Sequence, residues 1–182
     1  MNSIKLHLGC GKRYIPGFIH VDLANFKHIK FKRNVKNLSC FKNNSADLIY
    51  ACQVLEYFDV DEINVVLKEW RRVLRKDGTL RLSVPNFKII SLLYHNKKLK
   101  LDKLLGTLYG KWPLGKKNIY HKIVFDFNYL KKILIKNKFK KIKKWDWRLT
   151  EHSDIDDFSQ AYYPHMDKTK GILFNLNIEC KK

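Results

Sequence analysis

The sequence predicts an α/β fold built on an open parallel sheet, and two observations carry this prediction. Residues 4–8 have strand character and run directly into Gly9 and Gly11, which allow a sharp turn. Residues 47–84 give a short apolar strand, an amphipathic helix and a second strand with short connections, which is typical of a βαβ unit. The length allows one domain with a substantial core, so residues 1–182 are expected to form a single domain.

The helix of the βαβ unit is the clearest local signal in the chain. Asp59 can cap it, Glu62 completes a capping box, and apolar residues then repeat at helical spacing. The helix is predicted to end at residues 76–78, with Gly78 as a left-handed cap before a strand over residues 79–84.

The opening residues indicate a cofactor site at the carboxyl end of the sheet. Glycine has no Cβ, so the backbone at Gly9 and Gly11 can pass close to a ligand at the edge where α/β proteins bind cofactors. Residues 18–22 form a second predicted strand that ends in Asp22. A carboxylate there can accept hydrogen bonds from ribose hydroxyls, which indicates a nucleoside-containing cofactor. The simpler alternative is a glycine turn with a solvated Asp22.

Two common phosphate-binding motifs do not fit. The dinucleotide fingerprint requires a glycine where Tyr14 stands, and its acid lies about 20 residues further on, whereas Asp22 follows Gly11 by only 11 residues. Residues 12–17 leave room for about one helical turn, whereas a pyrophosphate needs a full helix N-terminus. No Gly-Lys-Ser/Thr of a P-loop follows. A nucleoside cofactor without phosphates fits these residues better.

These residues resemble the class I, Rossmann-like S-adenosylmethionine-dependent methyltransferases. Residues 6–11 look like the first motif of that family, and Asp22 looks like its ribose-binding acid. Residues 44–50 resemble its fourth strand, residues 54–58 the turn that follows, and residues 69–80 the helix and turn before the fifth strand. Over nearly its whole length the chain resembles small bacterial predicted methyltransferases of type 11, some linked to surface-polysaccharide gene clusters.

The resemblance implies a seven-stranded, mostly parallel sheet in the order 3-2-1-4-5-7-6, with the last strand antiparallel and helices on both faces. Residues 1–85 would form the cofactor-binding half and residues 86–182 the acceptor-side half. The second half would contain an insertion over residues 95–118, expected to be a loop from residue 104 on, and a hairpin loop over residues 148–170. A helix capped by Asp126 is predicted between them.

The resemblance also implies S-adenosylmethionine as the cofactor and S-adenosylhomocysteine as its product. The glycine turn would pass the methionine part, Asp22 would hold the ribose, and the residues after the fourth strand would lie under the methyl group. Asn34 stands where the family often has an aspartate beside the adenine. The predicted cofactor-binding residues are Leu8, Gly9, Cys10, Gly11, Asp22, Leu23, Asn34, Leu38, Gln53, Val54 and Leu55.

A hydroxyl acceptor would require a general base. His121 is the first candidate because it lies between two predicted helices of the second half, and His165 and Glu56 are the others. Each has a structural alternative, namely a surface or core histidine and a glutamate at a helix start. No metal is predicted, because the spacing of the one possible ligand set matches no standard site. That set comprises His152, Asp154, Asp156 and His165.

The composition of the chain bears on whether it binds nucleic acid, where it is located and whether it spans a membrane. The formal net charge of +20 invites a nucleic-acid partner, but 30 of the 37 basic residues are lysines, and arginine is the better reader of phosphates and bases. The four cysteines have no Cys-x-x-Cys spacing and are expected to be reduced, which favours a cytoplasmic protein. No apolar run is long enough for a membrane span.

The sequence therefore predicts an S-adenosylmethionine-dependent methyltransferase that acts on a small molecule, a sugar or a glycan precursor. The first alternative is a non-catalytic or partner-dependent binding protein that has kept the fold. An RNA methyltransferase is the weaker alternative, because it rests on charge alone. The acceptor, the oligomeric state and the pathway stay open at this point.

Overall fold

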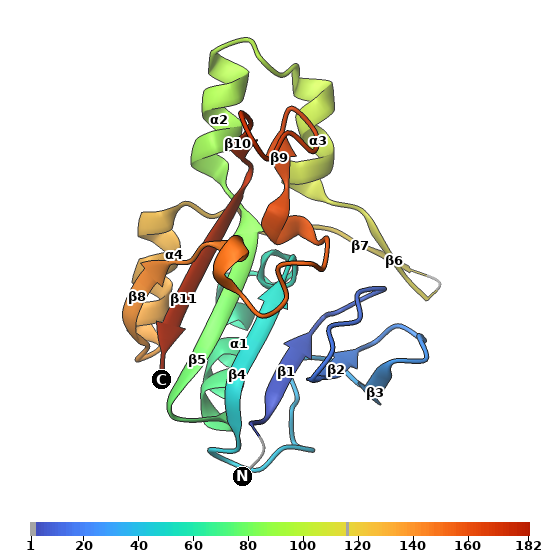
Figure 1. Cartoon of the computed structure of the whole chain (residues 1–182), viewed down its shortest axis with the longest axis vertical. Helices are drawn as coiled ribbons and strands as arrows, with labels where there is room; N and C mark the ends of the chain where they lie inside the picture. Colours follow the sequence, from blue (N-terminus) through green and yellow to red (C-terminus); the bar gives the residue numbers. More distant parts are fainter. Residues whose placement is uncertain (1–2, 116) are drawn as a thin grey trace.

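The computed structural model describes residues 3–115 and 117–182 and has a seven-stranded sheet at its centre (Figure 1). In sheet order the strands are β3 (Ile29–Lys32), β2 (Phe18–Asp22), β1 (Lys5–Leu8), β4 (Ala46–Cys52), β5 (Leu74–Pro85), β11 (Asn175–Lys181) and β8 (Lys140–Lys144). β11 runs antiparallel to both of its neighbours, and the pairs from β3 to β5 are parallel. Counted along the chain, the strands of this sheet have the predicted order 3-2-1-4-5-7-6.

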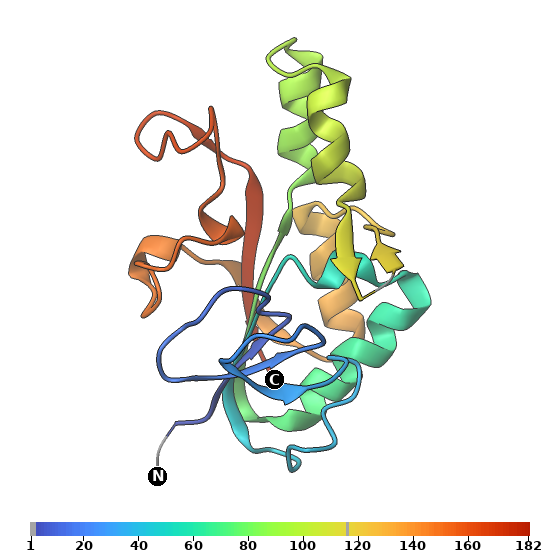
Figure 2. The ribbon, with the colours of Figure 1, turned by 90° about the vertical axis from the view of Figure 1, so that its right-hand side faces the viewer.

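Two helices cover one face of the sheet. Figure 2, in which the sheet is seen nearly edge-on, shows α1 (Val60–Val73) and α4 (Phe127–Lys136) on the same side. The apolar side chains of β1, β4 and β5 that point to this side join α1 and α4 in the main core, where Trp70 is fully buried. The other two helices, α2 (Phe87–His95) and α3 (Leu101–Tyr109), extend beyond the carboxyl ends of the strands (Figure 1).

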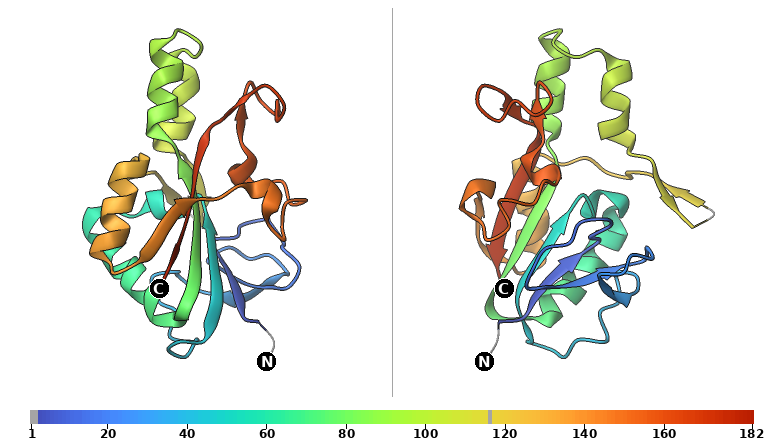
Figure 3. Two further views of the ribbon diagram at one scale, coloured as in Figure 1. Left: turned by 60° about the vertical axis from the view of Figure 1, so that its left-hand side comes forward. Right: turned by 45° about the vertical axis from the view of Figure 1, so that its right-hand side comes forward.

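Two loops cover the opposite face, which we call the loop face. Both views of Figure 3 place residues 145–161 there, and residues 9–17 pack against the same side of β1 and β4. Within the described residues these loops contain no α-helix, only the 3-10 turns η2 (Trp147–Leu149) and η3 (Phe158–Gln160). The prediction of helices on both faces thus holds for one face only. Residues 12–17 form no helical turn, because Pro16 and Gly17 break so short a segment.

The capping box predicted for α1 is confirmed, but its predicted end is wrong. The Asp59 carboxylate accepts from the Glu62 backbone N–H at 2.9 Å, and the Glu62 side chain accepts from the Asp59 N–H at 3.2 Å. α1 ends at Val73, and Asp77 rather than Gly78 has the left-handed conformation, with φ +60°. Gly78 is needed for a different reason, because a Cβ there would lie 2.9 Å from the Arg75 carbonyl oxygen.

The second half has more regular structure than expected. Residues predicted as a loop form the end of α3 and a hairpin of β6 (Trp112–Leu114) and β7 (Lys117–Ile119). The apolar residues of α3 have helical spacing, but Gly106 and the glycines that follow favoured a loop prediction. The long loop before β11 contains one more short pair, β9 (Tyr162–Tyr163) and β10 (Ile172–Leu173). The Asp126 cap of α4 is confirmed, since its carboxylate accepts from the Tyr129 N–H at 2.7 Å.

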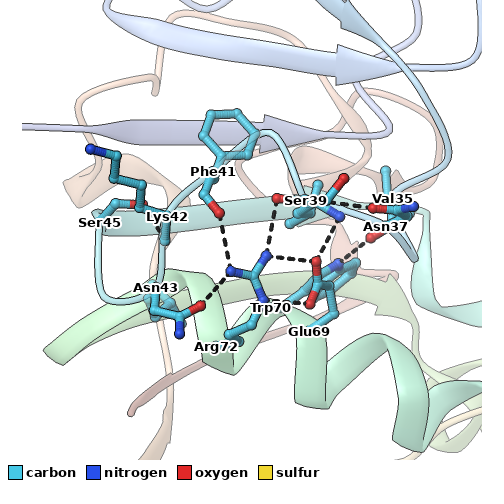
Figure 4. A network of polar contacts seen from close by, with 12 residues as sticks. Val35, Asn37, Ser39, Phe41, Lys42, Asn43, Ser45, Glu69, Trp70 and Arg72 are labelled. Atoms are coloured by element: carbon cyan, nitrogen blue, oxygen red, sulfur yellow. Dashed lines mark hydrogen bonds and ion pairs between the residues drawn. The ribbon is translucent and has the colours of Figure 1, made fainter.

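A polar network fixes residues 35–43 to α1 (Figure 4). Arg72 donates to the carbonyl oxygens of Leu38 and Phe41, at 3.1 and 3.0 Å, and pairs with Glu69 at 2.7 Å. Glu69 in turn accepts from the Leu38 N–H at 2.7 Å. The loop that follows β3 is thereby held in place without regular structure of its own. Among the described residues, no helix has the length and apolarity to cross a membrane.

Candidate active site

A cavity of about 1180 Å³ opens at the carboxyl ends of β1, β2 and β4. Three parts of the chain build its walls: the glycine turn with the ends of β2 and β3, the segment after β4, and residues of the second half within 99–114, 118–122 and 157–175. This is the edge of an α/β sheet at which ligands bind.

The glycine turn requires glycine at its first position. Gly9 has φ +63° and Gly11 has φ +51°. A Cβ on Gly9 would overlap the Val54 side chain, so β1 and the segment after β4 approach as closely as backbone allows. The Gly9 N–H donates to the Val21 carbonyl at 2.8 Å, which fixes the turn against β2.

Asp22 holds the glycine turn and faces the cavity. One carboxylate oxygen accepts from the Gly11 N–H at 2.8 Å, and the other accepts from the Ala24 N–H at 2.7 Å. Each carboxylate oxygen can accept a further hydrogen bond. Asp22 is therefore oriented by the backbone and keeps acceptor capacity for two neighbouring hydroxyl groups.

The end of β4 carries backbone strain beside the cavity. Gln53 has φ +56°, a backbone conformation that residues other than glycine rarely adopt. Its N–H donates to the Ser83 carbonyl at 2.9 Å. Such conformations persist where the surrounding structure enforces them, and they cluster at functional sites. Gln53 and Val54 both line the cavity.

Eight of the eleven predicted cofactor-binding residues line this one cavity: Gly9, Cys10, Gly11, Asp22, Leu23, Asn34, Gln53 and Val54. The other three, Leu8, Leu38 and Leu55, are at most 1% exposed and belong to the main core. Their side chains support the walls from behind. The Asn34 side-chain oxygen accepts from the Lys36 N–H at 2.9 Å, which makes a turn of this segment.

The structure brings two of the three acid–base candidates together. His121 Nε2 lies 4.0 Å from Glu56 Oε1, and the exposed fractions of the two side chains are only 5% and 1%. His121 Nδ1 lies 3.0 Å from the Thr107 carbonyl oxygen, so Nδ1 carries the proton and Nε2 is the basic nitrogen. Neither Glu56 oxygen has a hydrogen-bond partner among the described residues.

Burial sets the protonation of this pair. It raises the pKa of Glu56 to about 8, and it lowers the pKa of His121 from its usual value. At neutral pH the carboxyl is therefore protonated and the imidazole neutral. A neutral imidazole that lines the cavity can take up a proton.

The third candidate, His165, lines the same cavity from the long loop before β11. Six aromatic residues of this loop and of the segment after α3 line the cavity on the same side: Trp112, Tyr120, Phe158, Tyr162, Tyr163 and Phe174. Three lysines line the same side: Lys103, Lys111 and Lys122.

Sequence reasoning missed a carboxylate that reaches the cavity from the loop face. Asp157 lines the cavity, is 7% exposed, and accepts from the Tyr50 hydroxyl at 2.6 Å and from the Ser159 N–H at 2.8 Å. Tyr50 lies 107 residues earlier in the chain. The only signal in the sequence was the concentration of acids in residues 151–168, and it did not single out Asp157.

Several histidines are buried behind the glycine turn. His7 and His152 are each 2% exposed, and their rings lie 5.2 and 4.5 Å from that of Tyr50. Burial, followed by neighbouring histidines, lowers the pKa of His7 well below its usual value, and burial lowers the pKa of His152. Burial also lowers the pKa of His20 to about 4, and its Nε2 accepts from the Ile15 N–H at 2.9 Å. Across the described residues, no group of three or more His, Cys, Asp or Glu side chains is arranged to hold a metal ion.

Comparison with known proteins agrees with this architecture. Residues 16–82 match the family model described as a methyltransferase domain. Among curated protein sequences, none matches the chain. The structure resembles that of a possible histamine N-methyltransferase from Thermotoga maritima, with a TM-score of 0.63, 15% identity, and coverage of 100% of this chain and 83% of that one.

Two further solved structures show the same fold. A methyltransferase from Methanosarcina mazei has a TM-score of 0.59 at 17% identity and covers 100% of this chain and 93% of its own. The other is the 1,6-didemethyltoxoflavin-N1-methyltransferase of Burkholderia thailandensis, solved with S-adenosylhomocysteine and 1,6-didemethyltoxoflavin. Its TM-score is 0.57 at 14% identity, and the match covers 99% of this chain and 71% of that one.

The strand order and these similarities define the class of fold: this is the class I, Rossmann-like fold found in S-adenosylmethionine-dependent methyltransferases. Within this fold, the methyltransferase-domain model matches residues 16–82, a stretch that runs from the end of the glycine loop into β5.

Proposed function

We propose that the protein is an enzyme that transfers a methyl group from S-adenosylmethionine to a small molecule, a sugar or a glycan precursor. One observation carries the proposal. The glycine turn, the Asp22 carboxylate and the strained Gln53 line a single cavity at the carboxyl edge of a methyltransferase-type sheet. The cavity is larger than a nucleoside cofactor needs, so an acceptor has room beside it.

The residues present fit S-adenosylmethionine. Asp22 would accept from the two ribose hydroxyls, and Leu23 and Asn34 would border the adenine. The backbone of Gly9 and Gly11, both of which line the cavity, would lie along the methionine part. When bound, the cofactor supplies an electrophilic methyl group, and the protein supplies binding and orientation.

His121 would act as the general base for a hydroxyl acceptor. Its Nδ1 proton is held by the Thr107 carbonyl, so Nε2 is free to take the proton that the acceptor loses. Glu56 is protonated beside it and adds no charge to this part of the wall at neutral pH. Most of the rate would come from holding the acceptor oxygen in line with the methyl group.

The lining of the acceptor side supports a small ring-shaped acceptor. Aromatic side chains offer flat surfaces for a sugar or heterocyclic ring, and Lys103 and Lys111 favour an acceptor that carries negative charge. Lys122 adds little, because it is paired with Glu62 at 2.7 Å and with Asp59 at 3.5 Å. The neighbour from Burkholderia thailandensis was solved with bound 1,6-didemethyltoxoflavin, which agrees with a small-molecule acceptor.

Calorimetric titration of the full chain with S-adenosylmethionine and S-adenosylhomocysteine tests the proposal. We expect micromolar binding of both ligands, weakened at least about tenfold in Asp22→Asn, because the amide cannot accept all the hydrogen bonds of the carboxylate. Asp61→Asn is the matched control, since Asp61 is exposed on α1 and does not line the cavity. A folded wild-type protein that binds neither ligand would contradict the proposal.

The non-catalytic binding protein is the second candidate, and one observation favours it. His121 is only 5% exposed, so an acceptor needs some rearrangement to reach Nε2. Tight cofactor binding without turnover on any hydroxyl-bearing acceptor would support this candidate over the enzyme.

A further inference from the structure

Some lining residues of the cavity lie on the loop face of the sheet and have no role in the function proposed above. His7 on β1 and Cys52 on β4 line the cavity, and Asp157 joins them from the loop that covers this face. Lys12 and Arg13 line the cavity from the other covering loop, directly after the glycine turn. We call these five residues the loop-face pocket.

The strand order indicates which end of the cofactor would reach the loop-face pocket. β3 and β2 lie on one side of β1, and β4 lies on the other. A molecule with its ribose at Asp22 and its adenine beside Asn34 must extend past the glycine turn toward the end of β4. Its amino-acid end would then lie beside Cys52. This step rests on the proposed function.

Asp157 is built into the protein as a fixed carboxylate. Tyr50 points to the same side of β4 as Cys52, and its hydroxyl donates to one Asp157 oxygen at 2.6 Å. The Ser159 N–H donates to the other oxygen at 2.8 Å. These two bonds use one acceptor position on each oxygen, so the carboxylate can accept again from the cavity side.

The same pocket also contains a buried polar group without a hydrogen-bond partner in the described part of the chain, the imidazole of His7. His7 is 2% exposed, and its Nδ1 has no hydrogen-bond partner among the described residues. A buried polar atom without a partner is costly in a folded protein. Together with Asp157, it indicates that a polar ligand group completes this pocket.

The charges of the pocket match an amino acid. The Arg13 Nε donates to the carbonyl oxygen of Asp156 at 2.6 Å, so the two covering loops meet directly beside Asp157. One wall thus presents cationic side chains, Lys12 and Arg13, and the other presents a carboxylate. A free amino-acid end has an ammonium group for the carboxylate and a carboxylate group for the cations.

We propose that Asp157 binds the α-ammonium group of the methionine part of S-adenosylmethionine. The loop of residues 145–161 then does more than cover the sheet: it supplies a ligand-binding group from a segment more than 130 residues beyond the glycine turn. His7 and the cations of the glycine loop complete the pocket around the amino-acid end.

Three probes on the full chain test this assignment by calorimetry: S-adenosylhomocysteine, its deaminated analogue, and 5′-methylthioadenosine, which lacks the amino-acid end. We expect Asp157→Asn to weaken S-adenosylhomocysteine at least about tenfold, because a charged hydrogen bond in a desolvated pocket is lost. Binding of the other two probes should stay within about twofold of wild type. Asp154→Asn is the matched control, being exposed in the same loop and outside the cavity.

Two results would overturn the assignment. Unchanged binding of S-adenosylhomocysteine by Asp157→Asn would show that Asp157 does not hold the ammonium group. Equal weakening of all three probes would show that Asp157 only supports the fold of the loop. Either result leaves the proposed function intact, whereas a wild-type protein that binds none of the probes overturns both.

Discussion

Gly9 is the residue at which backbone conformation and close packing coincide most clearly. Its left-handed conformation and its contact with Val54 impose separate demands, and only glycine meets both. We expect Gly9→Ala to lose about 1 kcal/mol from backbone strain and at least about 1 kcal/mol more from overlap with Val54. Urea unfolding of the purified protein would measure the free energy of unfolding.

Gly17 provides a matched control for this prediction. It also has a left-handed conformation, with φ +79°, but an added Cβ would meet no atom within 4 Å. Gly17→Ala should therefore show the strain alone, and Val54→Ala should partly rescue Gly9→Ala. Equal losses in the two glycine variants would argue against a close approach at Gly9.

Glu56 and His121 show how one buried environment shifts the pKa values of an acid and a base in opposite directions. Burial disfavours charge on both, so the pKa of the acid rises and the pKa of the base falls. The sequence placed these two among three candidates by motif and chain position alone. Their 4.0 Å separation depends on α3, whose Thr107 carbonyl orients the ring, and that helix was not predicted.

At the level of single elements, α1 does more than cover the sheet. Through Glu69 and Arg72 it holds the irregular segment after β3, which leads from Asn34 into the core. Arg72→Met would leave the carbonyl oxygens of Leu38 and Phe41 without this donor. We expect a loss of about 2 kcal/mol in the free energy of unfolding, measured in urea.

The neighbouring arginine separates this network from a general effect of charge. Among the described residues, the Arg71 side chain makes one long hydrogen bond, from its Nε to the Lys138 carbonyl at 3.4 Å. Arg71→Met removes the same charge and should change stability by no more than about 0.5 kcal/mol. The network would be unimportant for stability if both variants unfolded at the same urea concentration.

Elements with strong local signals were predictable, and those fixed by tertiary contacts were not. β2 has its predicted bounds, and α1 begins at its predicted cap, because alternation and a capping box act within a few residues. The end of α1 was missed because β5 begins immediately at Leu74, in register with Ala46 of β4. Pairing with a neighbouring strand outweighed the helical pattern there.

On the scale of the whole molecule, the loop face should make stability depend on pH. The pKa values of His7, His20 and His152 are lowered in the folded protein, whereas an unfolded histidine titrates near pH 6.5. The unfolded state therefore binds more protons below that pH, and the stability these neutral histidines allow is lost as pH falls from about 6.5 toward 4. Urea unfolding between pH 7 and 5 should show this decline.

His152→Leu isolates one contribution to the decline. Neither ring nitrogen of His152 has a hydrogen-bond partner among the described residues, although Glu151, Asp157 and Arg81 act on its charge. The variant should lose less stability than wild type between pH 7 and 5. Glu56 acts in the opposite sense, because its raised pKa favours the folded state as pH falls below about 8, but it does so equally in both proteins. Parallel pH profiles for the two proteins would contradict this account.

The candidate site shows the same division between local and distant information. The glycine turn and Asp22 lie within the first 22 residues and could be assigned from their spacing. Asp157 could not be assigned in this way. Its place in the cavity depends on Tyr50 and on the loop that covers the face of the sheet where helices were predicted. A single sequence gives no measure of such distant pairings, so the wall that the second half contributes to the cavity was predicted only as a region.

The position of β11 has a consequence for how the chain is made. β8 leaves the ribosome well before β11, yet β11 lies between β8 and β5 and pairs with both. Until β11 has been synthesised, β5 has one unpaired edge and β8 has no place in the sheet. The nascent chain thus exposes a strand edge that can pair with other chains, and synthesis that stalls before Asn175 yields an aggregation-prone product rather than a smaller working domain.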